Sequence, residues 1–334
     1  MYRKNKTRIL LIVLIVLAVV FAVVQYSKQK QGERTFKEYV TELDTSKISG
    51  IVIIPGIENE VQDRLKLYKE QGNWKVKQGE DEYNALDGRI KQMINALQEL
   101  KTESIAGLDK SSWTEFEVTD SSGTRVQILY DGKVTQEIIV GKSKYIQNQA
   151  QQVRQPMQYN QPGGNMMSYV RLADDEKVYM VEGFLKTSFA PNINSYRDKT
   201  IIDSEPAQWS SLQFNYPGDS SFTLVKKNKH WLIDGREPVD SNMVSEYFNK
   251  INRISGSEFA GGPLGQASHT LTIKGNMPSP VQISAAPADT VHQYIVHSSM
   301  NKDAYFSGKK GRIFSRLFVS KSYFKPDNSE AGEE

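Results

Sequence analysis

The sequence predicts an α+β fold in which an N-terminal transmembrane helix is followed by two internally repeated α+β units. Three observations support this prediction: an apolar run near the N-terminus, a tryptophan-containing hairpin that occurs twice, and an amphipathic helix pattern that follows each hairpin. Each unit is expected to contain a β-hairpin with Trp, one amphipathic helix and several antiparallel strands.

The composition is that of a folded protein with room for two domains. The chain has 334 residues, of which 38% are hydrophobic and 24% are charged. The net charge of +3 is too dilute for a nucleic-acid footprint, which needs basic residues clustered on one face. Cysteine is absent, which excludes disulfides, zinc–thiolate sites and thiol nucleophiles.

The apolar run covers residues 9–24, with Tyr26 just beyond it. Flanking interfacial side chains extend it to a full span, so we expect a transmembrane signal anchor over residues 9–26. The alternative is a cleaved signal peptide, but the run is long and lacks a small-x-small cleavage triplet. The basic residues before it place residues 1–8 in the cytoplasm and the bulk of the chain in the periplasm, at the bacterial inner membrane.

The remaining chain divides into five segments. Residues 27–47 read as a juxtamembrane tether and a short amphipathic helix, in which Phe36, Tyr39, Val40 and Leu43 share a face. The first α+β repeat is expected at 48–183 and the second at 204–325, joined by a linker at 184–203. Residues 326–334 are acidic and are expected to be a disordered tail.

The repeat is clearest in its hairpins and helices. Trp74 and Trp231 each close a hairpin, and the apolar positions of the two following helices differ by a constant 154. Asp87 and Ser241 stand at the same spacing and are the expected N-cap residues. We interpret both tryptophans as core residues that bridge hairpin and helix, in preference to sugar-stacking platforms. The matched helix positions are Ile90 and Val244, Met93 and Tyr247, Ile94 and Phe248, Leu97 and Ile251, and Leu100 and Ile254.

After each helix the pattern predicts strands. Ile139-Val140 aligns with Ile295-Val296, and residues 312–317 read as the last strand. The first repeat has a Gln-rich insertion at 147–164, which is either a docking loop or disordered. As a docking loop it would bind a partner through Gln147, Arg154, Met157 and Tyr159.

Nothing in the sequence indicates catalysis. The four histidines are not arranged as metal ligands, and neither a nucleophile elbow nor a phosphate-binding loop occurs. We therefore expect no catalytic residues, no cofactor and no metal, and a protein that is not an enzyme.

Several short segments resemble the bacterial domain-of-unknown-function 4340 family. They include Gly72-Asn-Trp74-Lys-Val76, Tyr169-Val-Arg171 and Tyr196-Arg-Asp-Lys199, and the resemblance extends over about residues 45–262. It implies a genomic setting beside gliding-motility-type ABC-transporter subunits, without an established activity. The long Gln-rich insertion departs from the family pattern.

Together these features lead to two functional hypotheses. The first is a membrane-anchored, extracytoplasmic accessory or scaffold protein of a membrane complex, with ABC-type transporter subunits as partners and no nucleic acid. The alternative is a cell-envelope glycan-binding protein that uses exposed aromatic residues such as Tyr145, Tyr159 and Tyr169.

Overall fold

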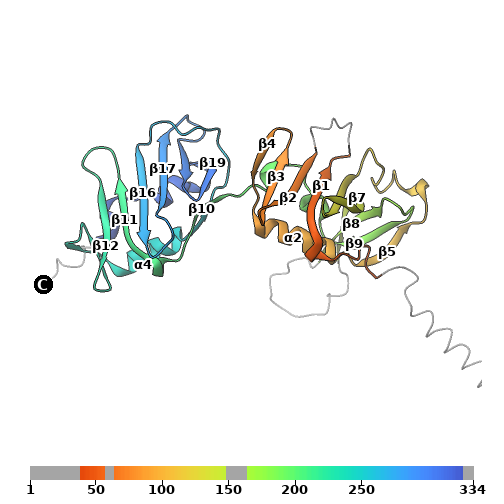
Figure 1. Cartoon of the computed structure of the whole chain (residues 1–334), viewed down its shortest axis with the longest axis horizontal. Helices are drawn as coiled ribbons and strands as arrows, with labels where there is room; N and C mark the ends of the chain where they lie inside the picture. Colours follow the sequence, from red (N-terminus) through yellow and green to blue (C-terminus); the bar gives the residue numbers. More distant parts are fainter. Residues whose placement is uncertain (1–37, 57–63, 148–163, 326–334) are drawn as a thin grey trace, which may run out of the picture. The chain divides into compact units, whose positions relative to one another are not determined.

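The structure is a computed structural model that describes residues 38–56, 64–147 and 164–325. Its chain forms two compact units: the first lies within the residues up to Asn192, and the second contains the chain from Ile193. Two short stretches of the first repeat, Gly72–Val76 and Asp81–Asp87, belong to the second unit. Figure 1 shows the two large sheets, each accompanied by one longer helix.

The fold is mostly β, which makes the expected α+β class wrong. The only helices of more than five residues in the described chain are α2 (Asp87–Gln98) and α4 (Ser241–Ile251). Nearly all other regular structure is antiparallel strand, because consecutive hairpins satisfy each other's backbone groups within two continuous sheets.

The first sheet has nine strands in the order β4-β3-β2-β1-β6-β7-β8-β9-β5. Its strand bounds are β1 (Ile48–Ile54), β2 (Leu65–Glu70), β3 (Asn73–Gln78), β4 (Asp81–Asn84), β5 (Thr102–Gly107), β6 (Thr124–Tyr130), β7 (Lys133–Gln147), β8 (Gly164–Leu172) and β9 (Val178–Glu182). The short helix α3 (Leu185–Ser188) follows.

The second sheet has eight strands in the corresponding order β14-β13-β12-β11-β16-β17-β18-β19. Its strand bounds are β11 (Trp209–Asn215), β12 (Phe222–Lys227), β13 (His230–Ile233), β14 (Glu237–Pro238), β16 (His269–Gly275), β17 (Val281–Pro287), β18 (Tyr294–Ser298) and β19 (Asn301–Ser307). The strand after α4, β15 (Arg253–Ser255), pairs with β10 (Thr200–Asp203) in a separate two-stranded sheet, whereas β5 in the first unit joins the large sheet. The chain then forms α5 (Ile313–Leu317).

The strand registers correct one sequence alignment. In the first unit, Ile138 of β7 pairs with Val126 of β6, and in the second unit, Ile283 of β17 pairs with Leu271 of β16. Because β6 and β16 hold the same place in the two sheet orders, β7 corresponds to β17 and not to β18. Ile139-Val140 is therefore not equivalent to Ile295-Val296, because short apolar strands resemble one another and the alignment slipped by one strand.

The helices keep the spacing of 154, and their buried faces match. Ile90, Met93 and Leu97 of α2 are buried, as are Val244, Tyr247, Phe248 and Ile251 of α4. The N-cap of α4 is Asp240 rather than the expected Ser241. The Asp240 carboxylate accepts hydrogen bonds from the backbone N–H groups of Asn242 and Met243, at 2.7 and 3.2 Å.

Both hairpin tryptophans pack inward. Trp74 of β3 is 6% exposed, and Trp231 of β13 is half-buried against the core of the second unit. The Trp231 ring meets Phe248 of α4 edge-on, with centroids 5.0 Å apart, so this tryptophan joins hairpin to helix.

Two expected elements take another form. Residues 38–43, which belong to the expected juxtamembrane helix, are not helical. Tyr39 forms an antiparallel bridge with Lys101, and the Val40 N–H donates to the Leu100 carbonyl. This stretch therefore pairs with the chain just before β5, at the edge of the first sheet. The expected last strand, residues 312–317, contains helix α5 instead. Ile313 and Leu317 are both buried, as two residues four apart on a helix can be.

The membrane expectations also require correction. No helix in the described part of the chain is long and apolar enough to cross a membrane. The expected anchor, residues 9–26, lies outside the described residues, as does the expected tail at 326–334. The structure therefore does not support the expected single-pass signal anchor or the expected inner-membrane location.

Candidate functional site

The feature that most distinguishes the two units is a two-stranded ribbon formed by β7 and β8. Strand β6 pairs with β7 only as far as Val140, whereas β8 pairs with β7 as far as Gln147. On the other side, β9 pairs with β8 only from Met167 onward. Residues 144–147 and 164–166, called the ribbon here, therefore extend beyond the neighbouring strands.

Of the expected docking residues, only Gln147 lies on the described part of the ribbon. It is the last residue of β7, is exposed, and pairs with Gly164. Arg154, Met157 and Tyr159 lie outside the described residues. Tyr145 is an exposed large hydrophobic side chain of the ribbon, at 49% exposure.

The base of the ribbon is held by a bulge and a buried serine. The pairing of β7 with β8 shifts register between Val140 and Ser143, and the Lys142 N–H there donates to the Phe116 carbonyl at 3.0 Å. Position 141 must be glycine, because a Cβ would lie 2.1 Å from the Phe116 carbonyl oxygen.

Ser168 of β8 is the buried serine. Its hydroxyl is 3.1 Å from the Ser143 hydroxyl, donates to the Gly183 carbonyl at 2.7 Å, and accepts from the Leu185 N–H at 3.1 Å. This single side chain joins β7, β8 and the chain that follows β9. The ribbon therefore begins from a well-connected base.

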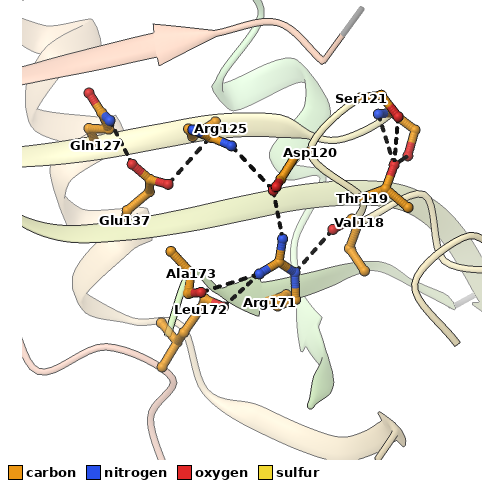
Figure 2. Close-up of polar contacts among 11 residues, drawn as sticks. Val118, Thr119, Asp120, Ser121, Arg125, Gln127, Glu137, Arg171, Leu172 and Ala173 are labelled. Carbon is orange, nitrogen blue, oxygen red and sulfur yellow. Dashed lines mark hydrogen bonds and ion pairs between the residues drawn. The ribbon is translucent and has the colours of Figure 1, made fainter. Parts of the chain in front are cut away.

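Arg171 of β8 supplies a further connection near this base, and Figure 2 shows its contacts. The side chain is 3% exposed although it carries a full positive charge. Its Nε donates to the Val118 carbonyl at 3.1 Å, and its Nη2 donates to the Asp120 carboxylate at 2.9 Å. Nη1 donates to the carbonyls of Leu172 and Ala173 at 3.3 and 3.5 Å.

An aromatic ring lies against the guanidinium group. Cζ of Arg171 lies 3.7 Å from the centre of the Trp113 ring, whose Nε1 donates to the Glu176 carbonyl at 2.8 Å. Every nitrogen of Arg171 is thus bonded within the protein. We conclude that Arg171 positions the chain around β8 and is not available to bind a ligand.

Figure 2 also shows how the network continues from Arg171 through Asp120 to side chains of β6 and β7. Asp120, which is 67% exposed, accepts from Arg171 and lies 3.2 Å from Nη2 of Arg125. Arg125 also contacts Glu137 at 3.3 Å, and Glu137 accepts from Gln127 at 2.6 Å. This row of polar side chains links β6 to β7 beside the buried arginine.

The glycan-binding expectation loses one of its three aromatic residues here. Tyr169 is 7% exposed, and its ring lies 4.5 Å from that of Phe116 in a small core cluster. Its position on β8 turns it inward, so it cannot present a face to a sugar. Tyr159 lies outside the described residues, which leaves Tyr145 as the exposed member of this set.

The segment Tyr196-Arg-Asp-Lys199 is structural. Tyr196 is fully buried, and Cζ of Arg197 lies 3.5 Å from the Tyr83 ring centre and 3.8 Å from that of Phe259. Burial lowers the pKa of Arg197. The Asp198 carbonyl accepts from Asn301 at 2.9 Å, so the motif fixes this part of the second unit.

Within the described residues, no group of three or more His, Asp or Glu side chains could hold a metal ion. His269, His292 and His297 come from the same unit, but the structure does not gather them into one site.

With the geometry in place, comparison with known proteins is informative about family. Residues 159–272 match the family model of a domain of unknown function, DUF4340. The expected family resemblance is confirmed. The DUF4340 match contains β8, β9, the Tyr196–Lys199 segment, the second tryptophan hairpin and α4. No curated protein and no solved structure matches the chain.

In the sequence, Arg171 stands out only as part of a family motif. One local signal could have marked its role: an arginine between apolar residues on a predicted strand, where a charged side chain must be paired if it is buried. Asp120, Val118 and Trp113 are about fifty residues away in the sequence and could not be assigned as its partners without the structure.

Proposed function

We propose that this protein is an accessory or scaffold protein that binds ABC-type transporter subunits through the ribbon, and that it is not an enzyme. The observation that carries the proposal is the ribbon itself. The two units share sheet order and helix packing, whereas their β7–β8 and β17–β18 hairpins differ. In the second unit, pairing ends at Pro287 and Tyr294, and no ribbon follows.

The ribbon has the features of a rigid binding element. An isolated two-stranded hairpin is only marginally stable in water, so a ribbon needs support at its base. Ser168 and Arg171 provide that support from β8. Binding to a preorganised element costs less ordering entropy, and this favours affinity.

The exposed side chains of the ribbon suit a protein partner. Tyrosine is enriched at binding hot spots because it combines a large apolar ring with a hydroxyl. Tyr145 lies on β7 between Lys144, which is exposed, and Ile146, which is partly buried. The choice of transporter subunits as the partner class follows from the family resemblance and its implied genomic setting.

Site-specific photo-crosslinking tests this proposal in the full chain. A photoreactive phenylalanine replaces Tyr145 in one variant and Val134 in a matched control, since Val134 is 52% exposed at the other end of β7. We expect the residue 145 probe to crosslink transporter subunits in cells and the residue 134 probe to leave them unlabelled. Equal labelling by both probes, or labelling by neither, would overturn the proposal.

A further inference from the structure

The second unit contains a hollow at the end of its sheet that has no part in the ribbon. It has a volume of about 520 Å³, within the range of about 300–1,000 Å³ typical of small-molecule sites. Its walls come from the β11–β12 turn, the first residue of β16, helix α5 and the chain that follows α5. The residues that matter for its chemistry are Tyr216, Asp219, His269, Phe314, Phe318 and Lys321.

Aromatic rings form the apolar part of this hollow and hold each other in place. The imidazole of His269 lies 5.1 Å from the Tyr216 ring, 4.9 Å from Phe314 and 5.6 Å from Phe318, measured between ring centres. Phe314 in turn stacks on Tyr294, with centroids 3.6 Å apart and planes 6° apart. These contacts give the wall a fixed shape.

A hydrogen bond ties the two sides of the hollow together. The Tyr216 hydroxyl donates to the Val319 carbonyl at 2.8 Å, which joins the residue after β11 to the chain after α5. Burial raises the pKa of Tyr216, so this hydroxyl stays protonated and keeps its donor role at neutral pH.

Two polar groups of the hollow remain available to a ligand. Nδ1 of His269 lies 2.9 Å from the Ser268 hydroxyl, whereas Nε2 has no hydrogen-bond partner among the described residues. The Asp219 carboxylate likewise has no hydrogen-bond or ion-pair partner there, and it lies on the exposed turn after Gly218. Together they offer one ring nitrogen and two carboxylate oxygens.

The positive charge of Lys321, which also lines the hollow, is already neutralised by two carboxylates. Nζ of Lys321 lies 3.1 Å from the Asp234 carboxylate and 2.7 Å from the Glu237 carboxylate. An anionic ligand would therefore meet a lysine that is already bound and a free carboxylate at Asp219. Phosphorylated and carboxylated ligands are disfavoured for this reason.

We propose that this hollow is a binding site for a neutral saccharide. Sugar rings have an apolar C–H face that packs on aromatic rings. Tyr216 and Phe314, which are partly exposed, supply such rings, and the buried Phe318 packs against both of them. Their hydroxyl groups both donate and accept hydrogen bonds, which suits the carboxylate of Asp219 and the Nε2 of His269. The site lies in the second unit and is independent of the ribbon function.

The first unit offers no counterpart of this site in its described residues. Strand register places Thr124 where the second unit has His269, because Ile128 and Ile273 occupy equivalent positions beside β1 and β11. The helix at the corresponding place after β9 is α3, whose residues Leu185–Ser188 include no aromatic side chain, whereas α5 supplies Phe314. The saccharide site is thus a property of one repeat.

Ligand-observed NMR with the full chain tests the proposal. The probes are neutral oligosaccharides (cellohexaose, maltohexaose and the N-acetylglucosamine hexamer), and inorganic phosphate and polygalacturonic acid oligomers are the anionic comparison. The variant Asp219→Trp fills the hollow from an exposed turn, and Lys274→Trp is the matched control on an exposed position of the same strand as His269.

We expect at least one neutral oligosaccharide to bind, Asp219→Trp to weaken it at least about tenfold, and Lys274→Trp to leave it unchanged. The variant His269→Phe keeps the aromatic packing, removes Nε2 and is expected to weaken binding as well. Absence of binding by all neutral probes, preference for the anionic ones, or unchanged binding by Asp219→Trp would overturn the assignment. Crosslinking from residue 145 is expected to persist in Asp219→Trp, which separates this test from that of the ribbon.

Discussion

Replacing Arg171 by methionine is the sharpest test of how the base of the ribbon is held. The substitution keeps an unbranched side chain that ends two atoms short of the terminal guanidinium nitrogens, and it removes five N–H donors from a site that is 3% exposed. The carbonyls of Val118, Leu172 and Ala173 lose their charged donor, as does the Asp120 carboxylate.

The loss of stability expected for Arg171→Met depends on how exposed these partners are to water. Breaking a fully buried ion pair costs about 3–5 kcal/mol, because the remaining charge stays desolvated. The Asp120 side chain is 67% exposed, so its carboxylate can be solvated by water once Arg171 is removed. The cost of leaving a desolvated charge therefore largely disappears. What remains is the loss of bonds to carbonyls, at about 1–3 kcal/mol for one left unsatisfied, and of the stacking on Trp113. We expect Arg171→Met to destabilise the first unit by about 2–4 kcal/mol.

Native-state hydrogen exchange read by mass spectrometry measures this effect locally, which is necessary because a chain of two units need not unfold in one step. Peptides from β6 to β8 are expected to lose protection in Arg171→Met, while peptides from the second unit keep theirs. The matched control is Arg253→Met, an arginine that is 71% exposed and pairs with Asp203 and Glu205. If Arg171→Met changes protection no more than this control does, the reasoning about the buried network is refuted.

Two further predictions concern the second unit. Asp240→Ala should destabilise α4 by about 1 kcal/mol in urea unfolding, whereas Ser241→Ala should have little effect; the opposite ranking would show that the N-cap is misassigned. Lys321 donates a hydrogen bond to the Glu237 carboxylate and so lowers its pKa below the ordinary value of 4.5. This pair therefore adds stability above pH 4.5 that is lost as the pH falls through the lowered pKa. The stability difference between the parent chain and Glu237→Gln should shrink towards zero on acidification, and a difference independent of pH from 2 to 7 would contradict the linkage.

The sequence predicts the helices of this protein better than its strands for a physical reason. The positions of α2 and α4 could be read from apolar residues at steps of three and four, a pattern contained within one segment. Strand identity depends on which other strand provides the partner, and a period of two is shared by every half-buried strand. The match of Ile139-Val140 with Ile295-Val296 is therefore wrong, and so is the strand predicted for residues 312–317, of which 313–317 form a helix.

The candidate sites show the same difference between features set by local sequence and features set by contacts between distant segments. Gln147 and Tyr145 could be placed near a long insertion from the sequence, since the insertion is local to one hairpin. The inward position of Tyr169 and the buried contacts of Arg171 depend on residues about fifty positions away. The hollow around His269 is assembled from three separate stretches of the second unit, so no local pattern could indicate it.

By itself, the sequence determined the spacing of the two helices, the inward packing of the tryptophan hairpins and the family resemblance. Those properties follow from the period of the apolar side chains and from short motifs, both of which are local. Only the tertiary structure decided that the fold is mostly β, that β7 and β8 continue as a ribbon, and that aromatic residues from distant segments meet around His269. These properties depend on backbone pairing and packing between distant segments, which are set by the whole fold and not by any single stretch of chain.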